Sequence, residues 1–108
     1  MSVYTELCDA VESTGLKTSA IALPTSAGSY AVIRMTSQIT EKTADDKPTI
    51  YGNYLQVDIF TDSDVNAKAE AVRDAAMEAG FVYRGRSDSA AGARQHAEIR
   101  LMKLETAT

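Results

Sequence analysis

Three stretches of the chain alternate between apolar and polar side chains, and this pattern limits the fold more than any other feature. They cover residues 30–39, 54–60 and 95–104. A period of two predicts strands that bury one face and leave the other in water. The first two stretches should pair as a long antiparallel hairpin. The side chains expected to point inward are Ala31, Ile33, Met35, Ile39, Leu55, Val57, Ile59, Ala97, Ile99 and Leu101. Those expected to point outward are Arg34, Thr36, Gln38, Gln56, Asp58, His96, Glu98 and Arg100.

A first amphipathic helix is predicted over residues 3–14. Ser2 is a suitable N-cap, because its hydroxyl can accept a bond from the first free backbone N–H groups. Apolar residues then recur every three or four positions, which places them on one face. Gly15 suits the end of the helix, since glycine readily adopts the left-handed conformation required there.

A second helix follows the central strand and has the strongest signals. Asp62 or Ser63 should cap it, and Gly80 should end it, with Phe81 in position for the hydrophobic contact that often follows a C-terminal glycine. The apolar face repeats at steps of four and three residues, over Val65, Ala69, Val72, Ala76 and Ala79.

The remaining segments predict connections and short strands. Residues 16–23 suggest a short extended segment, and 25–29 a loop. The polar run 40–48 predicts a hairpin loop of about nine residues. Residues 81–84 suggest a short strand, and 85–94, rich in Gly, Ser and Ala, a loop before the last strand.

These elements predict one α+β domain over residues 1–108. We expect an antiparallel or mixed sheet of about four to five strands with two helices packed on one face. Fractions of 44% hydrophobic and 24% charged residues are ordinary for a globular domain of this kind. The other face of the sheet should be open and polar, and it is a candidate surface for self-association.

The charges disfavour a protein dedicated to nucleic-acid binding. Fifteen acidic and eleven basic residues give a net charge of −4. The basic residues gather only at Arg84, Arg86 and Arg94, where Asp88 interrupts them, whereas proteins that neutralise phosphates concentrate Lys and Arg on one face. These arginines are the best candidates in the sequence for docking an acidic partner.

Membrane and secretory classes are also disfavoured. No apolar stretch is long enough to cross a bilayer. Glu6 and Asp9 lie where a signal peptide would be basic and then apolar, so we expect cytoplasmic synthesis and no membrane partner. The lone Cys8 cannot form an internal disulfide or a multi-cysteine metal site.

We expect no catalysis, no cofactor and no metal site. His96, the only histidine, could pair with Glu98 on the same strand face, but we favour a solvated strand histidine without a nucleophile to activate. Cys8 at the edge of the first helix's apolar face suggests a half-buried structural thiol. The scattered aspartates do not fit a calcium loop, and residues 85–94 lack the spacing of a phosphate-binding loop.

The whole chain resembles the tail terminator, or tail-completion, proteins of long-tailed bacteriophages. The resemblance covers residues 3–104 and depends on the order of four weakly specific features. These are the helix at the extreme N-terminus, the strand 55–60 leading into the helix 62–80, the exit Ala79-Gly80-Phe81 into a strand, and the closing strand 96–101. One departure is Ser29-Tyr30-Ala31, which occupies the place where many relatives have a proline–aromatic pair, and this affects the expected register of residues 30–39.

The resemblance implies a structural role. Such proteins form a six-fold ring on the head-proximal end of a finished tail tube, stop its growth and present a docking surface to the head connector. DNA passes through the ring without specific binding, and an acidic protein suits a lumen along which DNA slides. The expected partners are therefore further copies of the chain, the tail tube protein and the head–tail connector protein. The candidate assembly contacts are Asp45, Asp46, Lys47, Arg84, Arg86, Arg94, Glu98 and Arg100.

Two other functions remain open from the sequence. One is a head–tail adaptor from the same virion neck, which differs in the neighbour it binds. The other, of a different class, is a cytoplasmic regulatory α+β domain that binds a small ligand. Such a domain normally has a glycine-rich turn between strand and helix, and Thr61-Asp62-Ser63 contains no glycine.

Overall fold

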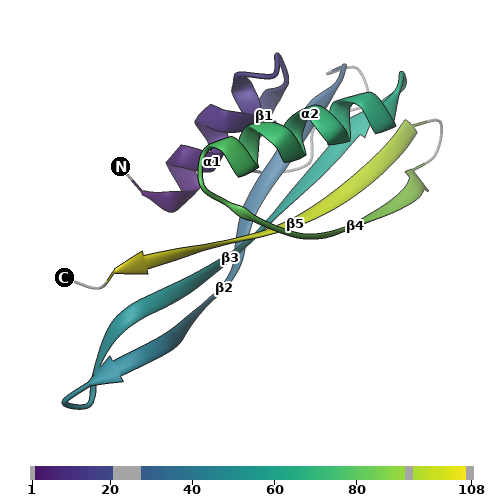
Figure 1. The fold of residues 1–108 in the computed structure, drawn as a ribbon. Coiled ribbons are helices and arrows are strands. Elements are labelled where there is room, and N and C mark those ends of the chain that lie inside the picture. Colours follow the sequence, from purple (N-terminus) through teal and green to yellow (C-terminus); the bar gives the residue numbers. More distant parts are fainter. Residues whose placement is uncertain (1, 21–27, 92–93, 107–108) are drawn as a thin grey trace.

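The structure is a computed structural model that describes residues 2–20, 28–91 and 94–106. The elements in chain order are α1 (Val3–Glu12), β1 (Lys17–Ser19), β2 (Tyr30–Ala44), β3 (Lys47–Thr61), α2 (Val65–Glu78), β4 (Val82–Ala91) and β5 (Arg94–Thr106). The strands form one mixed sheet in the order β1-β2-β3-β5-β4, in which β1 and β2 are parallel and the other pairs antiparallel. Both helices lie on one side of this sheet (Figure 1). The predicted α+β class and its layer arrangement are confirmed.

Helix α1 begins as predicted and ends slightly earlier. The Ser2 hydroxyl accepts a hydrogen bond from the backbone N–H of Thr5 at 3.1 Å. After Glu12 the chain tightens into bonds that reach back only three residues, from Thr14 to the Val11 carbonyl and from Gly15 to that of Glu12. The chain then leaves the helix through Gly15, whose φ of +94° suits glycine.

Helix α2 is capped by Asp64 rather than by Asp62 or Ser63. The Asp64 carboxylate accepts from the N–H of Ala67 at 3.1 Å, which also places a negative charge at the positive end of the helix. The two residues predicted as caps lie in the preceding turn, where the N–H of Ser63 donates to the Thr61 hydroxyl at 3.1 Å.

The C-terminal end of α2 follows the prediction. The N–H of Gly80 bonds to the Met77 carbonyl, and that of Phe81 to the Ala76 carbonyl, both at 3.0 Å. This pair of bonds is the Schellman motif, which needs a left-handed residue, and Gly80 has φ +95°. Phe81 is buried against the core, as its position after the glycine predicts.

The predicted hairpin loop over residues 40–48 is wrong. Strands β2 and β3 continue to Ala44 and Lys47, and a two-residue turn of Asp45 and Asp46 joins them. Both aspartates have positive φ, +52° and +61°, as a type I′ turn requires. The prediction failed because this ribbon extends into solvent, where no apolar alternation marks its strands.

The predicted loop over residues 85–94 is also wrong where the structure describes it. Strand β4 continues to Ala91 and pairs with β5 throughout, with one irregularity at Gly85, whose φ is +148°. Small and polar residues are tolerated because this is an edge strand. The remainder of this predicted loop, residues 92–93, lies outside the described residues.

The N-terminal extended segment is confirmed in part. Residues Lys17–Ser19 form β1, a short parallel edge strand beside the start of β2. Residues 21–27, which include the rest of that segment and most of the predicted loop 25–29, lie outside the described part of the chain.

One hydrophobic core lies between the helices and the inner face of the sheet. Eight of the ten side chains predicted to point inward are buried, and Met35 and Ile39 are not, at 41% and 49% exposed. Met35 remains on the inner face beside Leu55, where the body meets the arm, whereas the register shift between Met35 and Ser37 turns Ile39 to the open face beside Gly52. The principal core residues are Val3, Leu7, Val11, Ile33, Leu55, Val57, Ile59, Val72, Phe81, Ile99 and Leu101.

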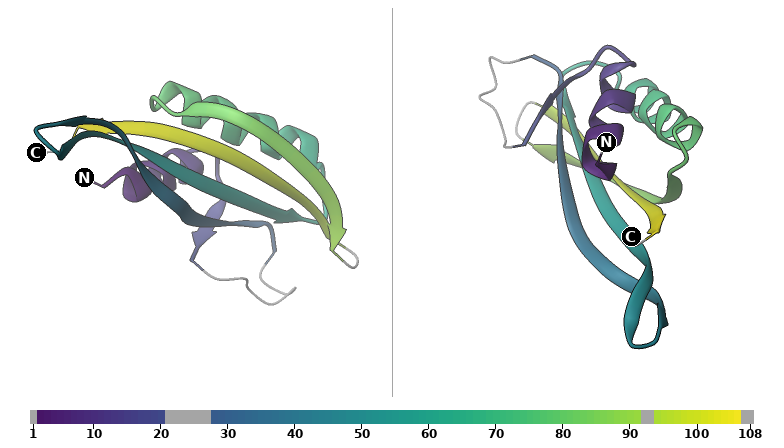
Figure 2. Two further views of the ribbon diagram at one scale, coloured as in Figure 1. Left: turned by 90° about the horizontal axis from the view of Figure 1, so that it is seen from below. Right: turned by 90° about the vertical axis from the view of Figure 1, so that its left-hand side faces the viewer.

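The molecule has two parts that differ in thickness. Residues 36–54 of the β2–β3 hairpin, flanked on one side by the end of β5, project beyond both helices and are called the arm (Figure 2). The molecule is accordingly elongated, measuring 53 × 23 × 21 Å. The rest of the chain forms the helix-covered body.

Candidate assembly surfaces

Aromatic side chains form a row on the part of the open face that belongs to the helix-covered body. Register places Tyr30, Phe60 and His96 side by side on β2, β3 and β5. The Tyr30 and Phe60 rings stack with centroids 5.2 Å apart, and the Phe60 ring and His96 imidazole with centroids 4.6 Å apart. The Arg94 guanidinium lies 5.6 Å from the centre of the Tyr30 ring and closes the row. This half of the open face is therefore already packed by its own side chains.

His96 is not the solvated strand histidine that the sequence suggested. Its Nε2 lies 2.9 Å from the Asp58 carboxylate and its Nδ1 3.0 Å from the Ser89 hydroxyl. The side chain is 18% exposed, and its acidic partner is Asp58 on the neighbouring strand instead of Glu98. Alternation along one strand cannot reveal this contact, because cross-strand register decides it.

The group Ser89–His96–Asp58 contains the residue types of a hydrolase triad in the opposite orientation. In serine hydrolases Nε2 faces the serine and Nδ1 the carboxylate. Here Nδ1 faces Ser89, and the imidazole is held flat against Phe60. The arrangement ties three strands together and fits a structural role.

Asp58 connects this row to the next one on the open face. Its carboxylate also accepts from the Gln56 amide at 3.1 Å and lies 3.8 Å from the Arg34 guanidinium. Gln56 and Asp58 point outward as predicted, yet both are buried, because neighbouring side chains on β2 and β5 cover them. The open face was predicted to be solvated, but around Gln56 and Asp58 it is shielded from solvent.

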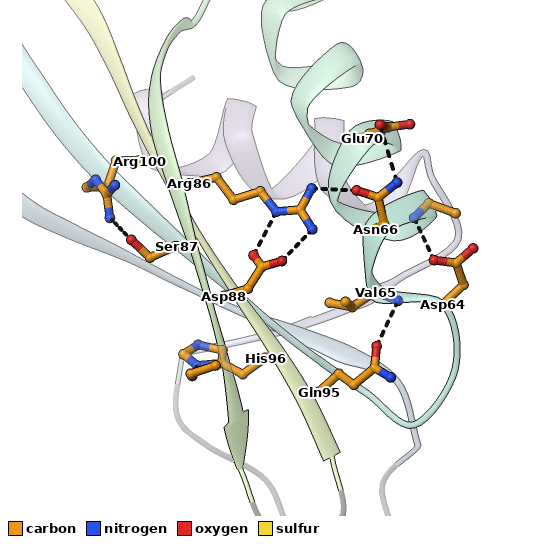
Figure 3. A network of polar contacts seen from close by, with 12 residues as sticks. Asp64, Val65, Asn66, Glu70, Arg86, Ser87, Asp88, Gln95, His96 and Arg100 are labelled. Carbon is orange, nitrogen blue, oxygen red and sulfur yellow. Dashed lines mark hydrogen bonds and ion pairs between the residues drawn. The ribbon is translucent and has the colours of Figure 1, made fainter.

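The predicted basic cluster does not form. Arg84 lies on the open face, 5.1 Å from the centre of the Tyr54 ring, whereas Arg94 is buried and donates to the Gly28 carbonyl at 2.9 Å. Arg86 points to the helical side, where it binds Asp88 through two hydrogen bonds of 2.7 and 2.8 Å and Asn66 at 3.0 Å (Figure 3). The β-strand conformation of β4 separates these arginines, since alternate residues point to opposite faces.

Arg86 joins the edge strand β4 to the first turn of α2. Its hydrogen bonds to Asp88 raise the pKa of the guanidinium and lower the pKa of that carboxyl. Both groups are charged at neutral pH in any case, so the pair is a local strut between two elements. It is therefore a poor candidate for docking an acidic partner.

Glu98 and Arg100 do lie on the open face, as predicted. The Arg100 guanidinium donates to the Glu98 carboxylate at 3.2 Å. It also donates to the Ser87 hydroxyl at 3.3 Å (Figure 3). Asp45 and Asp46 occupy the tip of the arm, at the far end from the helices, and Lys47 is the first residue of β3 (Figure 1). The predicted contacts are thus divided between the tip, the open face and, for Arg86, the helical side.

The open face becomes apolar where it continues onto the arm, which the sequence analysis missed. Ile39 and Leu104 face each other across Gly52 and are 49% and 55% exposed. The signal was present in β5, where the outward positions change from His96, Glu98 and Arg100 to Met102 and Leu104. A hollow of about 430 Å³ lies here, called the arm hollow, lined by Glu41, Lys42, Ile50, Tyr54, Met102 and Leu104.

The helical side of the molecule is acidic, in contrast to the apolar surface of the arm. With its cap, it carries seven acidic and two basic residues, a net charge of −5, compared with −4 for the whole chain. An open groove of about 610 Å³ runs between α1 and α2, with Asp9, Glu78 and Lys103 among its lining residues. Lys103 reaches it from β5 and binds Glu6 and, at 2.9 Å, the Ala79 carbonyl.

Cys8 packs against the core from α1 and is half-buried, as predicted. Burial raises the pKa of its thiol, and the hydrogen bond with Tyr4 only partly opposes this. The thiolate is therefore scarce at neutral pH. Within residues 2–20, 28–91 and 94–106, no three His, Cys, Asp or Glu side chains converge in a way that could hold a metal ion. None of the described helices is long and apolar enough to cross a membrane.

Comparison with known proteins gives a similarity of fold. No family profile and no curated protein sequence matches the chain. A chain in the solved structure of the virion of a native gene transfer agent particle aligns with a TM-score of 0.54 and 15% identity. The alignment covers 95% of this chain and 91% of that chain. The two chains share their fold over nearly their whole lengths.

Proposed function

We propose that this protein is a tail terminator, a virion protein that caps the finished tail tube as a six-fold ring and receives the head connector. It would be assembled in the host cytoplasm and remain at the head-proximal end of the tail. In this role it is a structural protein without enzymatic activity, and its partners are other copies of itself, the tail tube protein and the connector protein.

The observation that carries the proposal is the shared fold with a chain of a virion particle, since the alignment covers both chains almost completely. The resemblance of the element order to tail terminators gives the finer assignment. Two features of the structure support it. The arm projects beyond the core, and the open face beside it exposes apolar side chains, as expected of a protein completed by neighbours.

The net negative charge of the chain supports a ring whose lumen lets DNA pass. A ring of acidic subunits repels the phosphate backbone, so DNA would pass without being held. The dispersal of Arg84, Arg86 and Arg94 over different surroundings is consistent with this, because they do not form a continuous basic surface.

Deleting the gene in the particle-producing host and imaging the products tests the proposal. Tubes longer than those of the wild type are expected, and the wild-type gene supplied in trans should restore tails of uniform length. Antibody labelling should place the protein at the head-proximal end. Tails of normal length that fail to join heads would instead identify a head–tail adaptor, and unchanged particles would favour the small-ligand regulatory domain.

A further inference from the structure

The arm hollow is an apolar site on an otherwise polar sheet. Ile50, Met102 and Leu104 line it, and the Tyr54 ring closes the end nearest the body. The Tyr54 hydroxyl donates to the Glu41 carboxylate at 3.1 Å, and Lys42 on the rim has no ion-pair partner among the described residues. The Arg84 guanidinium lies over the face of the Tyr54 ring, 5.1 Å from its centre. A concave apolar site between two cations fits a convex apolar group flanked by acids.

The same chain presents such a group on α2. Met77 is 52% exposed although it belongs to the last turn of a helix packed against the core. Around it, Glu70, Asp74 and Glu78 are exposed; Asp74 is bound to Arg73, and Glu70 accepts from the Asn66 amide at 3.4 Å. An unbranched methionine adapts well to an irregular apolar hollow.

The charges of the two faces are complementary as a whole. The helical layer has a net charge of −5. Among the described residues, the open face has six basic and three acidic side chains, a net charge of +3, from Lys17, Arg34, Lys42, Arg84, Arg94, Arg100, Glu41, Asp58 and Glu98. Identical copies therefore attract one another when the open face of one meets the helices of the next.

We propose that the arm hollow is the docking site for α2 of a second copy of this chain, with Met77 inserted into the hollow and Lys42 paired with Glu78. The two surfaces are different, so the contact is heterologous and propagates in one direction, which is the type of contact that closes into rings. The inference deepens the proposed function, because it rests on the ring and specifies how neighbouring subunits contact each other.

Disulfide trapping tests the contact. In a Cys8→Ser background, Leu104→Cys combined with Met77→Cys should give, under mild oxidation, a ladder of covalent oligomers that extends beyond the dimer. The matched control combines Leu104→Cys with Ala71→Cys, which is also exposed on α2 but turned about 120° from position 77, and it should give little product. A product that stops at the dimer would indicate a symmetric contact and would overturn the proposal.

The trapping is performed both on purified tails and on the concentrated purified protein, which separates this inference from the proposed function. If labelling finds the protein at the tail end but position 77 gives no ladder, the contact is wrong and the function stands. If a ladder forms in solution but the protein is absent from tails, the contact stands and the function is wrong. If neither is seen, both fail.

A charge exchange provides a second readout. Lys42→Glu and Glu78→Lys should each lower the yield of complete particles about tenfold, and the double variant should recover most of it. Lys17→Glu makes the same change of charge on the open face but at the opposite end of β2 from the arm hollow, and it should lower the yield far less than Lys42→Glu. Failure of the double variant to improve on either single variant would contradict the Lys42–Glu78 pairing.

Discussion

The helix-covered body and the arm are made from the same two strands, yet they use different sources of stability. In the body, the inner faces of β2 and β3 meet two helices, and Ile33, Leu55 and Val57 are almost completely removed from water. Along the arm, β2 is exposed from Arg34 to its end, and the stabilising contacts are ladder hydrogen bonds and a few side-chain bonds. A ribbon of this kind is marginal in isolation, because burial of apolar area is the dominant favourable term in folding.

The difference indicates what each part is for. The core of the body is closed by its own helices, although Met77 on α2 and Val82 on β4 remain about half exposed at its surface. The arm leaves Ile39 and Leu104 in solvent and depends for its rigidity on strand pairing and on β5 along one side. Under the proposed function, the body supplies the stable core and the α2 surface, and the arm supplies the hollow that this surface enters in the next copy.

The largest effect on stability is expected in the body. Leu101→Ala removes a side chain that is 1% exposed in the middle of the core, and should lower the free energy of unfolding by about 2–5 kcal/mol. Leu104→Ala, three residues later on the same strand but 55% exposed, should change it by no more than about 0.5 kcal/mol. Urea unfolding of both variants measures this, and equal losses would show that the arm is as tightly packed as the body.

An intermediate effect is expected at the base of the arm. Asn53 is fully buried there, where its amide donates to the Lys103 carbonyl and accepts from Gln38 at 2.8 Å. Asn53→Ala leaves these partners unsatisfied and should cost about 1–3 kcal/mol. Thr40→Ala, at an exposed site farther along the arm, is the control and should be nearly neutral. If the two variants unfold at the same urea concentration, Asn53 does not anchor the arm.

The smallest effect is expected at the tip. Asp46→Gly gives the Asp-Gly pair that type I′ turns favour and relieves a positive φ at a residue with a side chain, so it should stabilise the arm by about 0.5–1 kcal/mol. Amide hydrogen exchange should slow in residues 37–52 and remain unchanged in the body. Asp46→Ala keeps the strain and should not slow exchange. Equal slowing in both parts would mean that arm and body open as one unit.

The sequence predicted the elements that have a core to face. The alternation of Leu55, Val57 and Ile59 and the spacing of Val72 and Ala76 reflect burial directly, so their faces were assigned correctly. Helix ends were also largely predictable, because caps act locally: Ser2 and Gly80 perform the roles that their chemistry implies. The end of α1 was placed two residues too late, and the start of α2 was misplaced because the Thr61 hydroxyl binds Ser63 in the turn before Asp64.

The elements that lack a core on either side were not predictable by the same reasoning. Residues 40–48 and 85–91 are polar or small, and they are strands because a neighbouring strand supplies their hydrogen bonds. Such pairing depends on a second segment elsewhere in the chain, so it cannot be predicted from the local composition. The predicted basic cluster failed for a related reason, since strand geometry places Arg84 and Arg86 on opposite faces.

Sequence alone was enough to predict the α+β class, the two helices with the N-cap Ser2 and the C-terminal Gly80, the inward faces of the strands in the body, and the outward placement of Glu98 and Arg100. The tertiary structure decided the partners of His96, the extension of the β2–β3 hairpin into an arm, and the apolar hollow on its open face. The physical reason is the range of the interactions: capping and burial periodicity are local, whereas register sets which side chains meet across strands. The contact between Asp58 and His96, 38 residues apart in the chain, exists only once β3 and β5 have paired.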